Sequence, residues 1–288
     1  SGLKAGGIGK LFRTIYKVIK DNLMPKKIFK AGKIFLGVVH LPPLPGSPRW
    51  GGNMKDVLCQ ATDEATKLRD GGVDGIIIEN FGDAPFRIGQ VDPETVAAMT
   101  LVTHTLRKLT DLPLGINILR NDAHSALAVA TATNSQFIRV NVHYGVMAAD
   151  EGIVEGQAFD TLRRKRLLGS DIKILADVLV KHAIPMGPSD LGLVARETIN
   201  RGLADGLIVS GQVTGMETDI ADVKKIRKAV PDNLLLIGSG SNPDNVSGLL
   251  KHADGAIVGT YLKKNGMINR PIDLERVTQM SLAIKHSS

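Results

Sequence analysis

The sequence predicts an α/β fold, a (β/α)8 TIM barrel that spans residues 33–288. Eight short apolar segments alternate with stretches of helical periodicity, and the segments are nearly continuous in apolar residues. Strands of this kind are typical of a parallel sheet that is buried on both faces. The length of 288 residues is also usual for one barrel. The expected strands are 34–40, 75–80, 114–119, 136–143, 172–179, 206–210, 234–239 and 255–260.

Helices are expected between these strands, and a repeated phrase supports their order. A five-residue pattern recurs at 73–77, 204–208 and 253–257, where the second, sixth and eighth strands begin. It consists of Val or Ala, then Asp, then Gly, then two apolar residues. Such a repeat favours a barrel over an open sheet. No Gly-x-Gly-x-x-Gly motif follows the first strand, so a dinucleotide-binding fold is not indicated. The clearest helical stretches are 54–69, 94–109, 191–201 and 219–229.

A basic amphipathic segment precedes the barrel at residues 1–32. Apolar residues recur at helical spacing between Ile8 and Leu23, with Lys and Arg largely on the other face. Such a helix can lie on an anionic membrane surface. Two alternatives stay open: a helix that packs over the bottom of the barrel, and the remainder of a targeting sequence.

The net charge of +7 belongs to this segment and not to the barrel. The first 33 residues hold nine of the 36 basic residues and one of the 29 acidic residues, which leaves the rest with a net charge of −1. A basic groove for nucleic acid is therefore not indicated in the barrel. The single cysteine, Cys59, excludes an intramolecular disulfide. No apolar run reaches the roughly 18 residues of a membrane span.

Two connections are long, at residues 41–53 and 144–170. The first contains four prolines together with Arg49 and Trp50, and the second contains a basic helix around residues 163–166. Long connections that follow barrel strands belong to the functional face. Both connections are therefore candidate lids.

A Gly/Ser turn follows the seventh strand and predicts a phosphate site. Its glycines let the backbone approach a ligand, and Asn242 followed by Pro243 indicates a helix start, whose free N–H groups favour an anion. After one short helix the eighth strand also ends in Gly, as at the phosphate site of many barrels. The alternative is that these glycines only form tight turns. The candidate phosphate-binding residues are Gly238, Ser239, Gly240, Ser241, Asn242, Gly259 and Thr260.

Polar residues on the inward-facing parity of the strands predict a site inside the barrel. Because alternate residues face the interior, Arg139, Asn141 and His143 should point inward from the fourth strand and Asp177 from the fifth. Buried charges are costly unless they are paired or serve chemistry. A structural ion pair of Arg139 with Glu79 or Asp177 is therefore the alternative to a ligand site. The candidates for ligand contact are His40, Asn117, Arg139, Asn141 and Ser210.

A reactive cluster is expected where the fifth strand ends. Lys181 and His182 follow Asp177 within one short turn, so a carboxylate, an ammonium and an imidazole are available for proton transfer. His143 and Glu79 complete the catalytic candidates. No metal ligand is assigned. The alternative is that His40, His143, His182 and Asp177 converge on a divalent ion. The sequence identifies no cofactor.

Six motifs and their order along the chain resemble the BtpA family, which is named for a photosystem I biogenesis protein. The resemblance runs from about residue 33 to the C-terminus and implies a TIM barrel akin to ribulose-phosphate-binding barrels. For the cyanobacterial member it implies a peripheral membrane location and a role in stabilising photosystem I reaction-centre proteins. Other members occur in non-photosynthetic organisms and resemble uncharacterised enzymes. The motifs are GVVHLPPLPGSP at 37–48, ENFGD at 79–83, RVN at 139–141, DVLVKH at 177–182, GQVTG at 211–215 and GSGSN at 238–242.

Two hypotheses about function follow. In the first, the protein is a peripheral membrane factor in photosystem I biogenesis that also binds a small phosphorylated ligand. In the second, it is a metabolic enzyme that acts on a phosphosugar or phosphonucleoside by acid–base chemistry. The expected partners are this ligand, an anionic membrane surface, photosystem I subunits and a second copy of the chain, with no nucleic acid. The expected location is the cytoplasm or the plastid stroma, peripheral on the thylakoid membrane under the first hypothesis.

Overall fold

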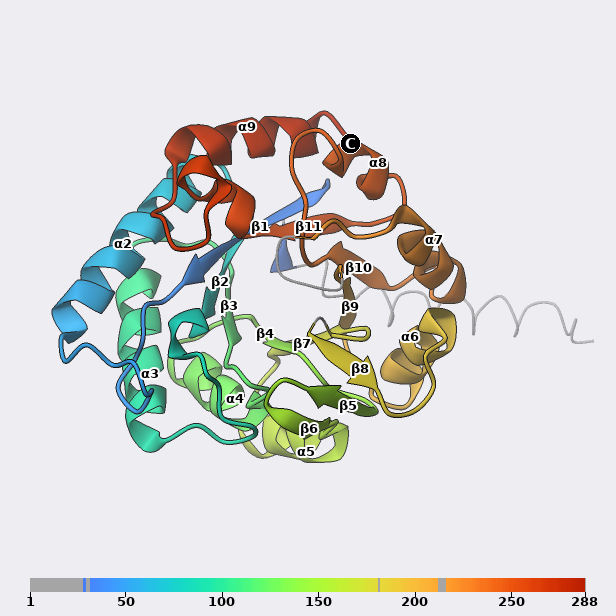
Figure 1. The fold of residues 1–288 in the computed structure, drawn as a ribbon, viewed down its shortest axis with the longest axis horizontal. Coiled ribbons are helices and arrows are strands. Elements are labelled where there is room, and N and C mark those ends of the chain that lie inside the picture. Colours follow the sequence, from blue (N-terminus) through green and yellow to red (C-terminus); the bar gives the residue numbers. More distant parts are fainter. Residues whose placement is uncertain (1–27, 30–31, 181, 212–215, 288) are drawn as a thin grey trace, which may run out of the picture.

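A computed structural model describes residues 28–29, 32–180, 182–211 and 216–287. It confirms the predicted barrel, because eight parallel strands close on themselves in the order β1–β2–β3–β4–β7–β9–β10–β11 (Figure 1). The predicted strands are all present, and most end one to three residues earlier than expected. The strands are β1 (Ile34–His40), β2 (Gly75–Glu79), β3 (Leu114–Asn117), β4 (Phe137–Val140), β7 (Lys173–Asp177), β9 (Gly206–Val209), β10 (Leu234–Ile237) and β11 (Gly255–Val258).

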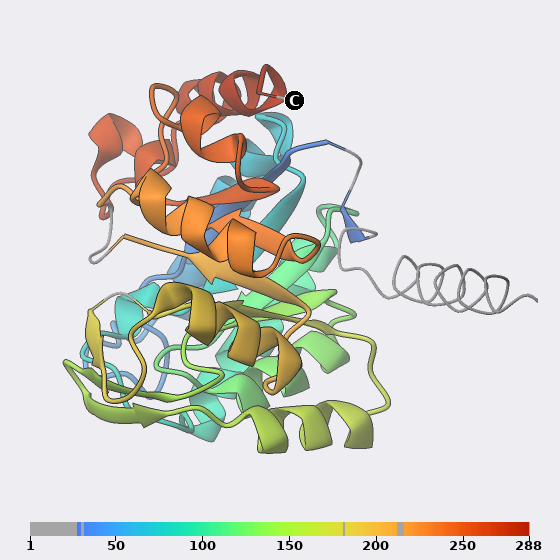
Figure 2. The same cartoon turned by 90° about the vertical axis from the view of Figure 1, so that its right-hand side faces the viewer.

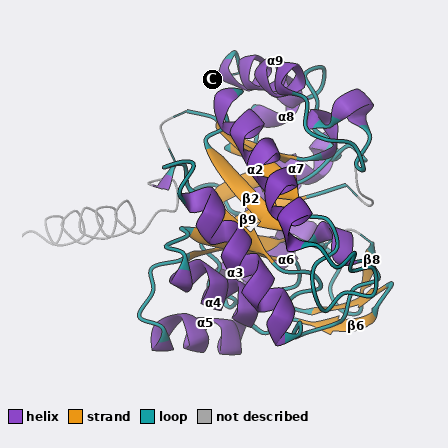
Figure 3. Ribbon diagram, turned by 90° about the vertical axis from the view of Figure 1, so that its left-hand side faces the viewer, coloured by secondary structure: helices purple, strands orange, loops and turns teal. Residues whose placement is uncertain are grey.

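Helices connect successive strands and cover the outside of the barrel (Figure 3). None of the helices that the structure describes is long and apolar enough to span a membrane. The helices are α2 (Met54–Asp70), α3 (Pro93–Arg107), α4 (Ala123–Ala132), α5 (Ala158–Leu167), α6 (Leu191–Asn200), α7 (Ile220–Ala229), α8 (Val246–Leu250) and α9 (Leu274–Lys285), with the short 3-10 helices η2 (Phe81–Asp83), η3 (Thr260–Leu262) and η4 (Lys264–Gly266).

The alternation of residues along the strands divides the buried side chains into two cores. One parity packs against the helices, and the other fills the barrel interior with residues such as Leu36, Ile77 and Leu236. Phe29 belongs to the interior core and packs edge-on against Phe137, with ring centroids 5.6 Å apart. The segment 28–29 thus closes the end of the barrel opposite the functional mouth (Figure 2). The barrel core therefore begins before β1.

The repeated Asp-Gly phrase ties the lower ends of neighbouring strands together. Before β2, Asp74 Oδ2 accepts the N–H of Phe35 in β1 at 2.9 Å. Asp205, before β9, and Asp254, before β11, accept N–H groups of β7 and β10 in the same way, each at 2.9 Å. The aspartates of the repeated phrase therefore fix the register of neighbouring strands at the bottom of the barrel.

The connections after β4 and β7 form a small lid sheet at the mouth. It consists of β5 (Val146–Ala149), β6 (Gly152–Glu155) and β8 (Ala183–Pro185), antiparallel in the order β6–β5–β8. Its inner residues Met147 and Val154 pack with Val142 and Val180 in a separate small core. The long connection 144–170 thus contributes a hairpin to the lid, while its helix α5 joins the outer ring of the barrel (Figure 1).

Candidate functional site

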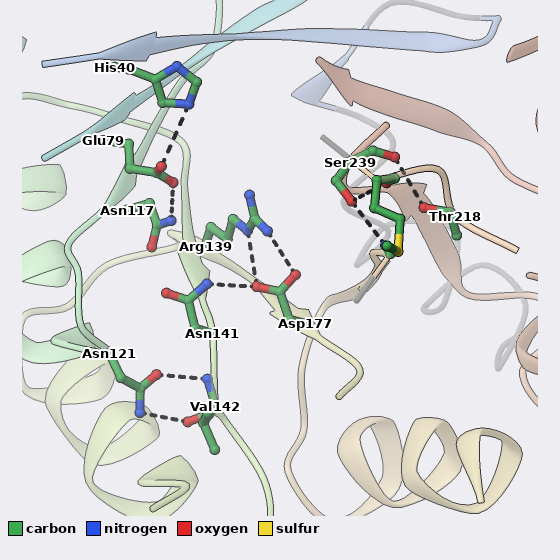
Figure 4. A network of polar contacts seen from close by, with 12 residues as sticks. His40, Glu79, Asn117, Asn121, Arg139, Asn141, Val142, Asp177, Thr218 and Ser239 are labelled. Carbon is green, nitrogen blue, oxygen red and sulfur yellow. Dashed lines mark hydrogen bonds and ion pairs between the residues drawn. The ribbon is translucent and has the colours of Figure 1, made fainter. Parts of the chain in front are cut away.

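The carboxyl ends of the barrel strands surround a cavity of about 220 Å³. The turns that follow β10 and β11 line one side of this cavity. His40, Glu79 and Arg139 line it from β1, β2 and β4. The structure therefore brings the predicted phosphate-binding turns and three of the inward polar residues to one place (Figure 4).

The turn after β10 is held from outside by the connection that follows β9. Ser239 Oγ accepts the N–H of Gly211 at 2.9 Å and lies 3.4 Å from the carbonyl oxygen of Met216. Thr218 Oγ1 donates to the carbonyl of Ser239 at 3.1 Å (Figure 4). The Ser239 hydroxyl is thus used to fix the turn and not to contact a ligand.

Close packing explains the glycines at these turns. Gly240 has φ +69°, and a Cβ atom there would overlap the carbonyl of Met216. A Cβ atom on Gly259 would overlap the ring of His40, and one on Gly238 would overlap Ser210 Oγ. The absence of side chains therefore lets neighbouring groups approach, which was the alternative left open by the sequence, and it does not by itself indicate a ligand.

The helix after this turn begins later than the sequence predicts. Asn242 Oδ1 nevertheless accepts the N–H groups of Asp244 and Asn245 at 2.9 and 3.1 Å, and the Asn242 carbonyl accepts the N–H of Val246 at 3.0 Å, so Asn242 caps the turn that leads into the helix, as the sequence predicts. Helix α8 starts at Val246 and has only five residues. Anion binding by its dipole, as the sequence suggested, is therefore not the basis of this site.

The donors left free in the two turns nevertheless suit an anion. Within the described part of the chain, the N–H groups of Gly240, Ser241, Gly259 and Thr260 meet no acceptor, and Ser241 Oγ is buried without a hydrogen-bond partner. All four residues line the cavity. Clustered backbone N–H groups of this kind bind phosphate oxygens.

Arg276 supplies a cation at the rim of the same cavity, and no sequence pattern marked it. It comes from α9, far along the chain from either turn. Its Nε donates to the carbonyl of Tyr261 at 2.6 Å, and its guanidinium carbon lies 4.1 Å from the centre of the Tyr261 ring. Because only Nε is used in this contact, the two Nη groups remain available for the bidentate bonds that Arg makes to phosphate.

A buried ion pair joins Arg139 and Asp177 inside the barrel. Arg139 Nη2 and Nε lie 2.9 and 3.1 Å from the two oxygens of Asp177, and Asn141 Nδ2 donates to the same carboxylate at 2.9 Å (Figure 4). Burial lowers the pKa of Arg139, but the carboxylates of Asp177 and Glu79 outweigh burial and raise this pKa overall. The predicted ion pair of Arg139 and Asp177 is therefore present.

Glu79 faces the cavity between an amide and an imidazole. Asn117 Nδ2 donates to Glu79 Oε2, and His40 Nε2 lies 3.8 Å from Glu79 Oε1 (Figure 4). The His40 ring also packs against Phe81, with ring centroids 4.8 Å apart. A carboxylate beside an imidazole on a cavity wall is an arrangement that can move a proton.

A second compartment of about 290 Å³ adjoins the first and shares Glu79, Phe81 and Arg139 with it. Asn141 lines it from the barrel, whereas Arg120, Glu151 and His182 line it from the connections. Arg120 Nε lies 3.5 Å from Glu151 Oε2. Lys181, which the sequence grouped with His182, lies outside the described residues.

The prediction that His143 points into the barrel interior was wrong. His143 is fully buried and its Nε2 lies 2.7 Å from the carbonyl oxygen of Gly202, beyond the end of α6. Burial lowers the pKa of His143. Strand β4 ends at Val140, so the alternation that placed Asn141 inside no longer holds two residues later. Among the described residues, no group of three His, Cys, Asp or Glu side chains is placed to hold a metal ion.

Comparison with known proteins matches residues 31–286 to the family model of the BtpA family. Photosystem I biogenesis protein BtpA of Synechocystis is 52% identical over 87% of this chain and 87% of its own. An uncharacterized protein of Pyrococcus furiosus is 47% identical over 85% and 92%. The putative sgc region protein SgcQ of Escherichia coli is 31% identical over 91% and 97%. The resemblance seen in the sequence is confirmed.

Solved structures of similar shape are barrel enzymes. Geranylgeranylglyceryl phosphate synthase of Thermoplasma acidophilum, in complex with sn-glycerol-1-phosphate, has a TM-score of 0.58 over 93% of this chain and 98% of its own, at 14% identity. Phosphoribosylanthranilate isomerase of Pyrococcus furiosus has a TM-score of 0.53 over 88% and 99%, at 11% identity. At these identities the likeness shows the fold alone.

The ion pair of Asp177 and Arg139 gives a prediction about stability. Asp177→Asn keeps the shape of the side chain but leaves Arg139 as a buried cation without its counter-charge. We expect the free energy of unfolding, measured by urea denaturation, to fall by about 3–5 kcal/mol. The double variant Arg139→Met, Asp177→Leu removes both charges and should recover much of this loss.

The control for this experiment is Asp171→Asn, at an exposed carboxylate, which should change stability by no more than about 0.5 kcal/mol. A loss of less than about 1 kcal/mol in Asp177→Asn, well below the cost of a broken buried pair, would show that the pair does not hold the interior together. Asp177 would then return to the catalytic candidates.

Proposed function

The chain belongs to the BtpA family, and from this premise and the geometry of the mouth we propose that it is a photosystem I biogenesis protein whose barrel binds a small phosphorylated molecule. The 52% identity to the Synechocystis protein of that name, over 87% of both chains, supports the role in biogenesis. The cavity between the two turns supports the ligand, because its free donors and Arg276 surround one space.

A phosphate group fits this end of the cavity better than a neutral group does. Its oxygens accept hydrogen bonds from several donors at once, and the turns offer backbone N–H groups, the Ser241 hydroxyl and the Arg276 guanidinium. A neutral ligand of the same size would leave most of these donors without partners. Buried donors without partners are costly.

Removal of the Ser241 hydroxyl tests the phosphate site. We expect inorganic phosphate and glycerol phosphate to raise the melting temperature of the protein, since a ligand at a hundred times its Kd adds about 2.7 kcal/mol. Ser241→Ala should weaken phosphate binding about tenfold or more, because a hydrogen bond to a charged group is lost. Ser125→Ala, on the outer helix α4, is the control. A wild-type melting temperature that phosphate leaves unchanged would contradict the proposal.

The variant Gly240→Val is unsuitable for this test. Its side chain would meet the carbonyl of Met216 and not the ligand space. It would therefore disturb the turn whether or not phosphate binds there.

A second candidate function is catalysis on the phosphorylated molecule. His40 and Glu79 form a carboxylate–imidazole pair on the wall that faces the phosphate turns. Proton transfer by a positioned pair of this kind contributes about 10²–10⁴-fold to a rate. Because Asp177 is tied to Arg139 and His143 to Gly202, acid–base chemistry in this cavity would depend on His40 and Glu79.

Complementation separates the scaffold from the enzyme. In Synechocystis that lacks its own BtpA, we expect this chain to restore the level of photosystem I reaction-centre proteins, measured by immunoblot. If the barrel acts as a scaffold, Glu79→Gln should restore them equally, because it keeps size and hydrogen bonds. If chemistry is required, this variant should fail while it still folds and binds phosphate. Failure of the wild-type chain would count against the role in biogenesis.

Membrane association is proposed for the part of the basic segment at residues 1–27, which lies outside the described residues. Deletion of residues 1–27 is the appropriate test, because a longer deletion would remove Phe29 from the barrel core. We expect the truncated chain to stay folded but to lose binding to anionic vesicles, since each basic residue near such a surface contributes about 1 kcal/mol. Binding of the full chain should also weaken with added salt. Equal vesicle binding by both chains would disprove this proposal.

A further inference from the structure

The second compartment presents hydrogen-bond acceptors on the side formed by the barrel strands. Asn141 donates its amide N–H to Asp177, and a carboxylate can only accept. The amide oxygen of Asn141 therefore points away from Asp177. This oxygen is buried and meets no donor among the described residues, and Asn141 lines the compartment. Glu79 also lines this compartment, and its Oε1 lies 3.8 Å from His40 Nε2.

The charges of this compartment are unlike those of the phosphate turns. Among the described residues that line it, Glu79, Asp150 and Glu151 stand against the guanidinium groups of Arg120 and Arg139. The Arg139 charge is already matched by Asp177, which lies outside the lining. The wall is therefore negative at neutral pH. A second anionic group on a ligand would be repelled here and would lose its hydration.

The two compartments meet at Glu79, Phe81 and Arg139, so one ligand can extend from one into the other. Resting on the proposed phosphate site, we propose that the ligand is a phosphate monoester whose other end carries hydroxyl groups and no second negative charge, as in a sugar phosphate. Its hydroxyls donate to Asn141 Oδ1 and to Glu79. The same wall disfavours a bisphosphate or a phosphorylated carboxylic acid.

Two ligands that differ only at the inner end test this inference. Erythrose 4-phosphate and 4-phosphoerythronate share the phosphate and the hydroxyls, but the second carries a carboxylate in place of the aldehyde. The measurement is titration calorimetry, in buffer with a chelator to exclude a bridging metal. Erythrose 4-phosphate should bind at least about tenfold more tightly than inorganic phosphate. 4-Phosphoerythronate should bind at least about tenfold more weakly than erythrose 4-phosphate, because its carboxylate meets Glu79.

The variant Asn141→Ala tests the assigned acceptor. It should lower the affinity for erythrose 4-phosphate about tenfold, the effect of a lost hydrogen bond, and it should lower the affinity for inorganic phosphate less. Asn200→Ala, at the exposed end of α6, is the matched control. The comparison of the two ligands on the wild-type chain stands even where Asn141→Ala fails to fold.

The outcomes distinguish this inference from the proposal on which it rests. Tighter binding of 4-phosphoerythronate, or equal binding of erythrose 4-phosphate and inorganic phosphate, would overturn the inference while the phosphate site stands. Binding of neither sugar phosphate nor inorganic phosphate would overturn both.

Discussion

The mouth of this barrel depends on the buried ion pair of Arg139 and Asp177. A carboxylate can only accept hydrogen bonds, so the two oxygens of Asp177 accept them from the guanidinium group of Arg139 and from the amide N–H of Asn141. The bond from the Asn141 amide N–H to Asp177 fixes the direction in which the amide oxygen of Asn141 points. Glu79 orients Asn117 in the same manner. The polar wall therefore follows from one requirement, that each buried charge be paired.

Strand alternation allowed the sequence to predict the fold and much of the interior, because a parallel barrel strand presents alternate residues to the inside. Arg139 and Asp177 were expected inside and lie there. The same reasoning failed at His143, since β4 has already ended at Val140 and the chain turns toward Gly202. The lid sheet was also missed, because β5, β6 and β8 are short and pair across two separate connections. The alternation of residues predicts which side chains face the barrel interior only as far as the strand remains paired with its neighbours.

Local patterns were least informative at the phosphate turns. A Gly-rich turn looks alike in sequence whether a ligand or a neighbouring backbone approaches it, and at Gly240 the neighbour is Met216. What favours an anion is the set of donors without partners, which includes the hydroxyl of Ser241. Arg276 joins this set from the last helix, where nothing in its local sequence distinguishes it from a surface arginine. Both features are properties of the assembled mouth.

The extent of the family match bears on how a biogenesis role and a ligand site share one chain. The match covers residues 31–286 and leaves out most of the basic segment, whereas both compartments lie within it. The Pyrococcus furiosus relative matches 85% of this chain at 47% identity, so the similarity is not confined to the Synechocystis protein that is named for photosystem I. The part of the chain that matches the family is therefore the barrel with its polar mouth. The two proposed roles therefore rest on the same barrel.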